Sequence, residues 1–488
     1  MLTRRVRAPR IDFGDLRREL KLPEQFPLAA QREADKAVET PLPETDRTDI
    51  PFVTIDPATS LDLDQAVCLR RRSGGGFRVY YAIADVAAFV PVNGALEAET
   101  WRRGQTVYLP DGKVPLHPLA LSEGAASLLP NVDRAAVVWS IDLDGDGATT
   151  AVHLERARVR SRAKLDYLGV QAAVDADRLA EPIALLPEIG RLLVARGLQR
   201  GAINLPMPEQ DVEPDGGGWT LVLRAPVPVE EYNAQISLLT GMAAARLMLD
   251  GGLGLLRTMP AARPDAVARL RSAAASLGIA WPAGASVGEV IATIHPAEPR
   301  AAAFLDHAAE LMRGAGYTAF DGTPPADPDH GAVAAPYAHV TAPLRRLADR
   351  YATEAALALY TGGEVPDWVR AALPKLPAVM AETDRVAGAA ERGAVDLTEA
   401  ILLADRIGDE FEAAVIDVDS APKPAPAKAS TRRTAPRRTA PRSPGGTVAL
   451  DDPPVRARCD GALPLGERVR VTLVEANPKR RTVRFALA

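Results

Sequence analysis

Residues 51–67 read PFVTIDPATSLDLDQAV and place three aspartates among apolar residues. The first part of this segment, residues 52–55, is β-branched and aromatic, which predicts a strand that ends at Asp56. Asp62 and Asp64 are two residues apart, so an extended backbone presents both on one face. Carboxylates that lie close together need a neutralising cation, and a hard ion such as Mg²⁺ prefers their oxygen atoms. A turn with solvated carboxylates explains the spacing equally well.

A second segment, residues 337–351, reads YAHVTAPLRRLADRY. Pro343 suits the first position of a helix, which predicts a helix start at this residue. Arg345 and Arg346 then fall in the first turn, where free backbone N–H groups and guanidinium groups favour phosphate. A basic helix start on the protein surface has the same pattern.

Together these two segments resemble the RNB family, the exoribonuclease II-like nucleases. The acidic motif of that family consists of a strand, an aspartate, a short turn and then Asp-x-Asp-Asp-Ala. Asp56, Asp62 and Asp64 match its first three acidic positions, and Gln65 stands at the fourth. Residues 337–351 resemble the family block Tyr-x-His-x-Thr-Ser-Pro-Ile-Arg-Arg-Tyr-x-Asp. The resemblance implies an α+β fold in which a mixed sheet, surrounded by helices, forms an RNA channel.

The same resemblance implies an activity and a set of site residues. The implied enzyme is a Mg²⁺-dependent hydrolase, a 3′→5′ exoribonuclease that degrades single-stranded RNA to nucleoside 5′-monophosphates with one or two ions. The implied catalytic residues are Asp64, Arg345 and Asp62. The implied metal ligands are Asp56, Asp62, Asp64 and Gln65. The implied RNA-binding residues are Tyr108, Tyr167, Glu231, Arg345, Arg346 and Glu391.

Several of these residues also have ordinary structural explanations. Tyr108 is either a stacking surface for a base or a buried core residue. Glu231 lies in the first turn of a helix expected from residue 228, where the helix dipole favours an acid. Gln65 offers an oxygen without a charge, so the competing function is an RNB-fold RNA-binding protein with weakened catalysis. A metal-dependent phosphoesterase for small nucleotides is a third hypothesis.

Composition is that of a soluble globular protein, because 47% of the 488 residues are hydrophobic and 25% are charged. Only two cysteines occur, Cys68 and Cys459, which argues against a disulfide framework and for a reducing compartment. No apolar run approaches the length of a membrane span. We therefore expect a cytoplasmic monomer that has RNA as its partner and no contact with a membrane.

Three regions are expected along the chain. Residues 1–47 form an N-terminal arm, residues 48–405 the catalytic domain, and residues 408–488 an S1-like OB barrel, whose strands alternate in hydrophobicity. Residues 421–446 interrupt this barrel with seven Lys or Arg and no acid. Such a Pro-, Ala- and Arg-rich insertion is expected to be disordered. Since the net charge of the chain is −5, an RNA path requires a local basic channel.

Overall fold

The computed structural model describes residues 3–295, 298–419 and 444–488. Five strands of its first half form a closed barrel in the order β2-β3-β4-β7-β8. Their bounds are β2 Phe52–Asp56, β3 Gln65–Arg71, β4 Phe77–Ala84, β7 Asp133–Leu143 and β8 Thr149–Asp166. A parallel pairing of β2 with β8 closes the barrel, and the other neighbours are antiparallel. The strand predicted at residues 52–55 is β2, and Trp139 and Tyr81 are buried in the barrel core.

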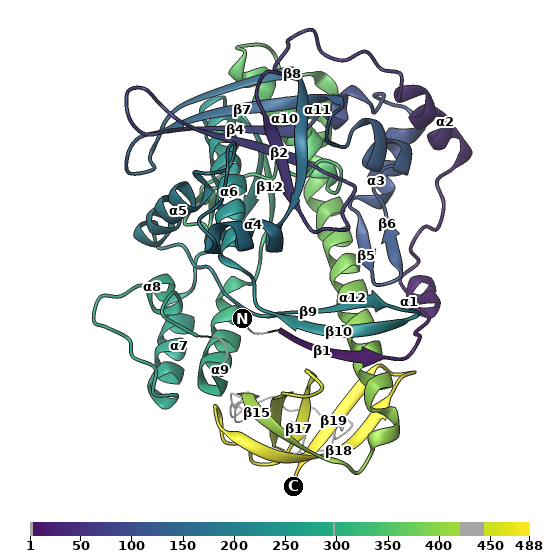
Figure 1. Ribbon diagram of the computed structural model, residues 1–488, viewed down its shortest axis with the longest axis vertical. Helices are drawn as coiled ribbons and strands as arrows, with labels where there is room; N and C mark the ends of the chain where they lie inside the picture. Colours follow the sequence, from purple (N-terminus) through teal and green to yellow (C-terminus); the bar gives the residue numbers. More distant parts are fainter. Residues whose placement is uncertain (1–2, 296–297, 420–443) are drawn as a thin grey trace, which may run out of the picture.

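Helices cover this barrel and extend from it (Figure 1). The first six are α1 Gly14–Glu19, α2 Leu28–Ala37, α3 Ala95–Arg103, α4 Tyr167–Asp175, α5 Leu186–Arg200 and α6 Pro228–Asp250. The others are α7 Pro264–Ser276, α8 Val287–Ile291, α9 Pro299–Ala309, α10 Leu347–Tyr360, α11 Asp367–Ala372 and α12 Leu376–Leu403. Apolar side chains of α6 and α10 share one core with the barrel strands, so these two helices shield one side of the barrel from water. No helix within the described residues is long and apolar enough to cross a membrane.

The helix start predicted at Pro343 is wrong. Helix α10 begins at Leu347, and Pro343 to Arg346 form a turn before it. Asp349, which is fully buried in the first turn of α10, accepts a hydrogen bond from the backbone N–H of Ala342 at 2.7 Å. This contact folds the preceding residues back toward the helix, so the segment reaches its helical conformation four residues later than the proline indicated.

Short strands form separate sheets beside the barrel. A three-stranded sheet has the order β1-β10-β9, with β1 Thr3–Ala8, β10 Gly218–Arg224 and β9 Glu209–Asp215. Three two-stranded antiparallel sheets are β5 Val107–Leu109 with β6 Gly112–Val114, β11 Leu253–Thr258 with β12 Gly316–Asp321, and β13 Asp329–His330 with β14 Ala335–Pro336. The N-terminal segment thus adds a strand to a sheet formed by residues about two hundred positions further along the chain.

A second closed barrel ends the chain, and Figure 1 shows it below the long helix α12. Its strands are β15 Glu410–Val418, β16 Gly445–Leu450, β17 Arg456–Asp460, β18 Arg468–Asn477 and β19 Thr482–Leu487, in the order β15-β16-β17-β19-β18. Phe411, Val415 and Phe485 are among its buried core residues. The predicted α+β fold with a C-terminal barrel is confirmed.

The basic insertion follows the first strand of this barrel. Residues 420–443 lie outside the described residues, so the expectation of disorder applies to a part of the chain that the structure does not describe. Gly445 and Gly446, which the sequence analysis assigned to the insertion, belong to β16. Gly446 lies opposite Val418 of β15, and both glycines pair with β17, Gly445 with Asp460 and Gly446 with Cys459.

Candidate active site

Strand β2 ends at Asp56 and β3 begins at Gln65, and the eight residues between them, 57–64, form the acid loop. Asp56 Oδ2 is buried and has no hydrogen-bond partner among the described residues. Burial raises the pKa of Asp56 to about 6, although Arg345 lowers it, and the neighbouring Asp62 raises it further. An oxygen of this kind is suited to a cation.

Two side chains fix the backbone of the acid loop. Lys164 Nζ donates hydrogen bonds to the carbonyl oxygens of Ala58 and Ser60, both at 2.6 Å. Ser127 Oγ donates to the carbonyl oxygen of Leu61, also at 2.6 Å. The loop is therefore held from both β8 and the segment before β7, and its aspartates project from a fixed backbone.

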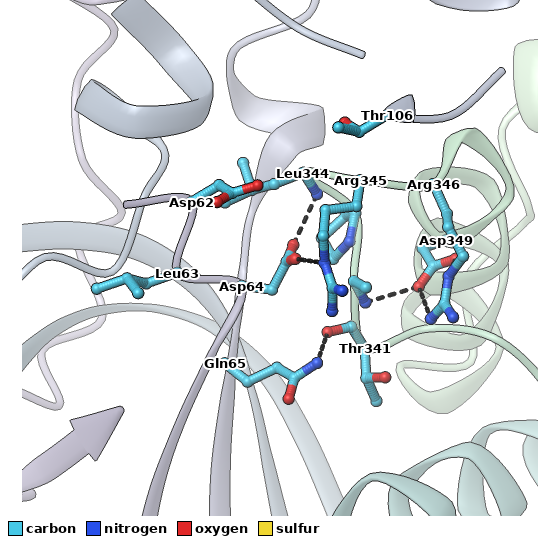
Figure 2. A network of polar contacts seen from close by, with 12 residues as sticks. Asp62, Leu63, Asp64, Gln65, Thr106, Thr341, Leu344, Arg345, Arg346 and Asp349 are labelled. Atoms are coloured by element: carbon cyan, nitrogen blue, oxygen red, sulfur yellow. Dashed lines mark hydrogen bonds and ion pairs between the residues drawn. The ribbon is translucent and has the colours of Figure 1, made fainter. Parts of the chain in front are cut away.

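Asp64 joins two distant parts of the sequence (Figure 2). Its Oδ1 accepts a hydrogen bond from the backbone N–H of Leu344, and its Oδ2 accepts one from Arg345 Nε, both at 2.7 Å. The Asp64 side chain is only 3% exposed, whereas that of Arg345 is 42% exposed. Burial raises the pKa of Asp64, while the Arg345 guanidinium and the Leu344 N–H lower it. The buried Asp64 carboxylate thus holds a guanidinium that remains partly exposed to solvent.

Asp62 is held by the β5–β6 hairpin. Tyr108 of β5 and Lys113 of β6 lie opposite each other in register. The Tyr108 hydroxyl donates to Asp62 Oδ2 at 3.0 Å, and Lys113 Nζ lies 3.0 Å from Asp62 Oδ1. Lys113 Nζ also lies 2.8 Å from Glu123 Oε1, on the π-helical turn Leu121–Ala125. Each oxygen of Asp62 thus contacts a different residue of one cross-strand pair.

The sequence analysis did not identify Lys113. A usable signal exists, because Pro110, Asp111 and Gly112 separate Leu109 from Lys113 and are typical turn residues. A hairpin at this turn brings the lysine beside Tyr108, which the family resemblance had already assigned to the site.

Gln65 is directed into the protein rather than toward the aspartates (Figure 2). Its Nε2 donates to the carbonyl oxygen of Thr341 at 2.6 Å, and its Oε1 accepts a hydrogen bond from the Tyr81 hydroxyl at 2.6 Å. The Tyr81 hydroxyl is also 2.8 Å from Ser237 Oγ on α6. Both ends of the amide are therefore used to connect β3 with β4 and with the segment before α10.

The four predicted metal ligands do not surround one point. Across the described ranges, no group of three His, Cys, Asp or Glu side chains is placed to hold a metal ion. Lys113 and Arg345 lie beside Asp62 and Asp64 instead. Magnesium nevertheless needs only one or two carboxylates when phosphate and water complete its shell. The unpartnered oxygen of Asp56, with Asp62 near it, fits such a two-carboxylate site, whereas the amide of Gln65 does not contribute.

Arg346 faces a different partner from Arg345. Its Nε and Nη2 donate to the two oxygens of Asp349, both at 2.9 Å. The backbone N–H of Thr106 donates to the carbonyl oxygen of Arg345 at 2.9 Å, which ties the β5–β6 hairpin to this turn. Arg346 therefore has a structural partner for its guanidinium, and Arg345 is the arginine that the fold directs to the aspartates.

The remaining predicted RNA-binding residues lie around the site in different environments. Tyr108 is 49% exposed, so it is not a buried core residue. It lines a cavity of about 350 Å³ together with Glu391 of α12. Tyr167 is half-buried beside Asn233. Glu231 accepts a hydrogen bond from Asn204 Nδ2 at 2.8 Å. Tyr108 and Glu391 thus share one cavity, and the other two belong to the α4–α6 side.

Comparison with known proteins adds to this geometry. The chain matches the RNB domain over residues 44–360 and the RNase II-type exonuclease C-terminal S1 domain over residues 431–488. Ribonuclease R of Acidithiobacillus ferrooxidans is 36% identical over 193 residues, which are 38% of this chain and 44% of that protein. The chain thus spans less than half the length of the first curated relatives that it matches.

Solved structures share the fold at lower identity. Apo RNase R of Mycoplasma genitalium has a TM-score of 0.81 and 20% identity, covering 97% of this chain and 77% of that one. Yeast Ssd1, described as a pseudonuclease, has a TM-score of 0.66 and 16% identity, covering 92% of this chain and 53% of that one. The RNB match spans more than half of this chain and includes both the acid loop and the Arg345 turn, so the chain belongs to the RNB family.

Proposed function

We propose that this protein is a 3′→5′ exoribonuclease that hydrolyses single-stranded RNA to nucleoside 5′-monophosphates. The observation that carries the proposal is the contact between Asp64 and Arg345, which joins the acid loop to a turn 281 residues away. A ribonuclease needs carboxylates and a phosphate-binding cation at one point, and this contact provides both. Curated relatives named Ribonuclease R support the assignment.

Arg345 is the residue proposed to bind the scissile phosphate. Its contact with Asp64 uses Nε, and the guanidinium is planar and remains charged, so its Nη groups suit phosphate oxygens. The negative charge that develops on the phosphate during hydrolysis is stabilised by a cation held in this fixed position. Asp64 keeps Arg345 oriented through this partly buried hydrogen bond.

Asp56 and Asp62 are the residues proposed to hold a divalent ion. Such an ion, when bound, neutralises phosphate charge and lowers the pKa of a water molecule. The exposed ring of Tyr108 supplies a stacking face for a terminal base, which accepts any base without reading its identity. RNase R of Mycoplasma genitalium has been solved with ribose-methylated single-stranded RNA, which supports RNA as the class of substrate.

A second candidate function is RNA binding without turnover. It is favoured by Gln65, a neutral residue at the fourth acidic position, whose amide is occupied by Thr341 and Tyr81. The likeness to Ssd1 shows that the fold also occurs in a protein described as a pseudonuclease. RNA shortening distinguishes the two functions.

The test uses single-stranded RNA labelled at its 5′ end, incubated with Mg²⁺ or with EDTA. We expect shortening from the 3′ end with release of mononucleotides in Mg²⁺ alone. Asp64→Asn should abolish this shortening and leave RNA affinity near that of the wild type, because the substitution removes a charge without removing volume. Asp15→Asn, on the exposed surface of α1, is the matched control and should behave as wild type.

Two results would count against the proposal. RNA that is bound but not shortened in either condition supports the binding function. Equal activity of Asp64→Asn and the wild type would show that hydrolysis occurs at another site.

A further inference from the structure

Lys113 occupies an unusual position for a lysine. Its side chain is only 19% exposed and contacts Asp62, whose side chain is 8% exposed, and Glu123, whose side chain is 22% exposed. An ammonium group is strongly hydrated, so placing it between a buried and a partly buried carboxylate requires that they replace its water. The lysine therefore belongs to the charge arrangement of the site rather than to a solvated surface.

The charges around the acid loop explain why a cation is needed there. Asp62 lies near both Asp56 and Asp64, and its negative charge raises the electrostatic cost of ionising each of them. Arg345 contacts Asp64, and Lys113 contacts Asp62. Two of the three carboxylates thus have a side-chain cation.

The hairpin gives the contact a defined geometry. Because Tyr108 and Lys113 are a cross-strand pair, their side chains project from the same face of the β5–β6 hairpin. Tyr108 contacts Oδ2 of Asp62, and Lys113 contacts Oδ1. An ammonium group has three N–H donors, and two carboxylates account for two of them.

We propose that Lys113 is a resident cation of the RNA site. Its ammonium group neutralises part of the negative charge of Asp62, which a divalent ion otherwise neutralises. Its third N–H donates to an RNA phosphate beside Tyr108. The inference rests on the proposed function, since it places RNA in this site. Lys113 consequently competes with a divalent ion for Asp62 and supports RNA binding when no ion is present.

A purely structural role for Lys113 makes a different prediction. If the lysine only fixed the hairpin on the acid loop, its loss would disorder Asp62 and Tyr108 together. Affinity for a divalent ion and affinity for RNA would then both fall. Competition requires the two affinities to change in opposite directions, because a removed positive charge favours a cation and disfavours a phosphate.

The experiment compares the wild type with Lys113→Met, Lys113→Arg and the control Lys36→Met on the exposed surface of α2. Mn²⁺ binding is measured by titration calorimetry without RNA, and affinity for labelled single-stranded RNA is measured in EDTA. For Lys113→Met we expect Mn²⁺ affinity to rise about tenfold and RNA affinity to fall about tenfold, as a partly screened charge contact predicts. Lys113→Arg and Lys36→Met should stay within about twofold of the wild type.

Glu123→Gln provides a second variant that leaves the lysine in place. It removes the other negative charge from Lys113 Nζ, so RNA affinity in EDTA should rise and Mn²⁺ affinity should fall. Parallel loss of both affinities in Lys113→Met, or no change in either, would overturn the proposal. Normal RNA shortening together with unchanged Mn²⁺ affinity in Lys113→Met defeats this inference alone. Wild-type protein that neither binds nor shortens RNA defeats the proposed function, and the Mn²⁺ titration still tests the lysine.

Discussion

The two closed five-stranded barrels of this chain differ in how far their charged side chains are exposed to solvent. At the rim of the first barrel, Asp64 is 3% exposed and accepts a partly buried hydrogen bond from Arg345, whose side chain is 42% exposed. On the C-terminal barrel, the Arg470 and Glu412 side chains that pair across strands are 64% and 60% exposed. Exposed ion pairs contribute about 0–1 kcal/mol, whereas a carboxylate as buried as Asp64 depends more strongly on its partner because water does not replace it. Strand number and closure therefore do not determine what a barrel does.

The connections between strands cause this difference. In the first barrel, the chain between β4 and β7 includes α3 and the β5–β6 hairpin, which reaches over the acid loop. Helices α6 and α10 cover another side of the same barrel. In the C-terminal barrel, β18 and β19 are joined by a short turn, and Arg484 beyond it is 48% exposed. Charged residues become a site where connections enclose them and a diffuse surface where they do not.

Gln65→Asp tests the site at the rim of the first barrel and should have the largest effect. Aspartate is one methylene shorter, so it cannot maintain both contacts of Gln65, and it adds a charge beside Asp64. Thr341 then loses its donor and Tyr81 one of its partners. We expect a loss of about 1–3 kcal/mol in the free energy of unfolding, measured by denaturant titration in EDTA.

Gln65→Met is the matched control, because it has a similar length and neither charge nor hydrogen bonds. Comparable destabilisation in both variants would assign the loss to the hydrogen bonds, and a larger loss in Gln65→Asp would assign the excess to charge. Undiminished stability with tighter Mg²⁺ binding in Gln65→Asp would show that position 65 is a ligand position, as the sequence analysis expected.

Glu399→Gln tests a buried carboxylate of α12 that contacts the C-terminal barrel, and it should have an intermediate effect. Glu399 of α12 accepts hydrogen bonds from Gln210 Nε2 at 2.7 Å and from the backbone N–H of Arg456 at 3.0 Å. Burial raises the pKa of Glu399 from 4.5 to about 7, with the two hydrogen bonds and Arg456 lowering it and Asp396 raising it. The folded protein therefore binds more protons than the unfolded chain between these two pH values.

The sign of the effect follows from this proton uptake. The contribution of Glu399 to stability is fully present below pH 4.5 and is lost as the pH rises through 7. Glu399→Gln should raise the melting temperature by a few degrees at pH 8 and change it little at pH 4.5. Glu382→Gln, an exposed change on the same helix, is the control. Identical pH profiles of Glu399→Gln and the wild type would contradict the assignment.

Local sequence patterns predicted the strand β2 and the alternating strands of the C-terminal barrel, because a period of two is a property of neighbouring residues. The family blocks indicated that Asp64 and Arg345 share a site. Neither source could predict the direction of the Gln65 amide, since its partner Thr341 is 276 residues away. Side-chain orientation depends on such distant contacts, which spacing along the chain does not contain.

Two further features show the same limit. A proline at position 343 suits a helix start locally, but the buried Asp349 holds Ala342 and delays the helix to Leu347. Strand β1 has the charged sequence TRRVRA and little alternation of apolar residues, and it exists because β10 offers it a pairing edge. Tertiary contacts determined both outcomes.

Deletion of the basic insertion tests the C-terminal part of the comparison and should have the smallest effect. Residues 421–443 are replaced by a short Gly/Ser turn, which the barrel can accept because Asp419 N–H donates to the carbonyl oxygen of Gly445 at 2.7 Å. Seven positive charges are removed, so affinity for long RNA should fall slightly and depend less on salt, since fewer counterions are released. A variant of equal length with serine at those seven positions separates charge from length. Equal salt slopes for all three proteins would show that the insertion does not contact RNA.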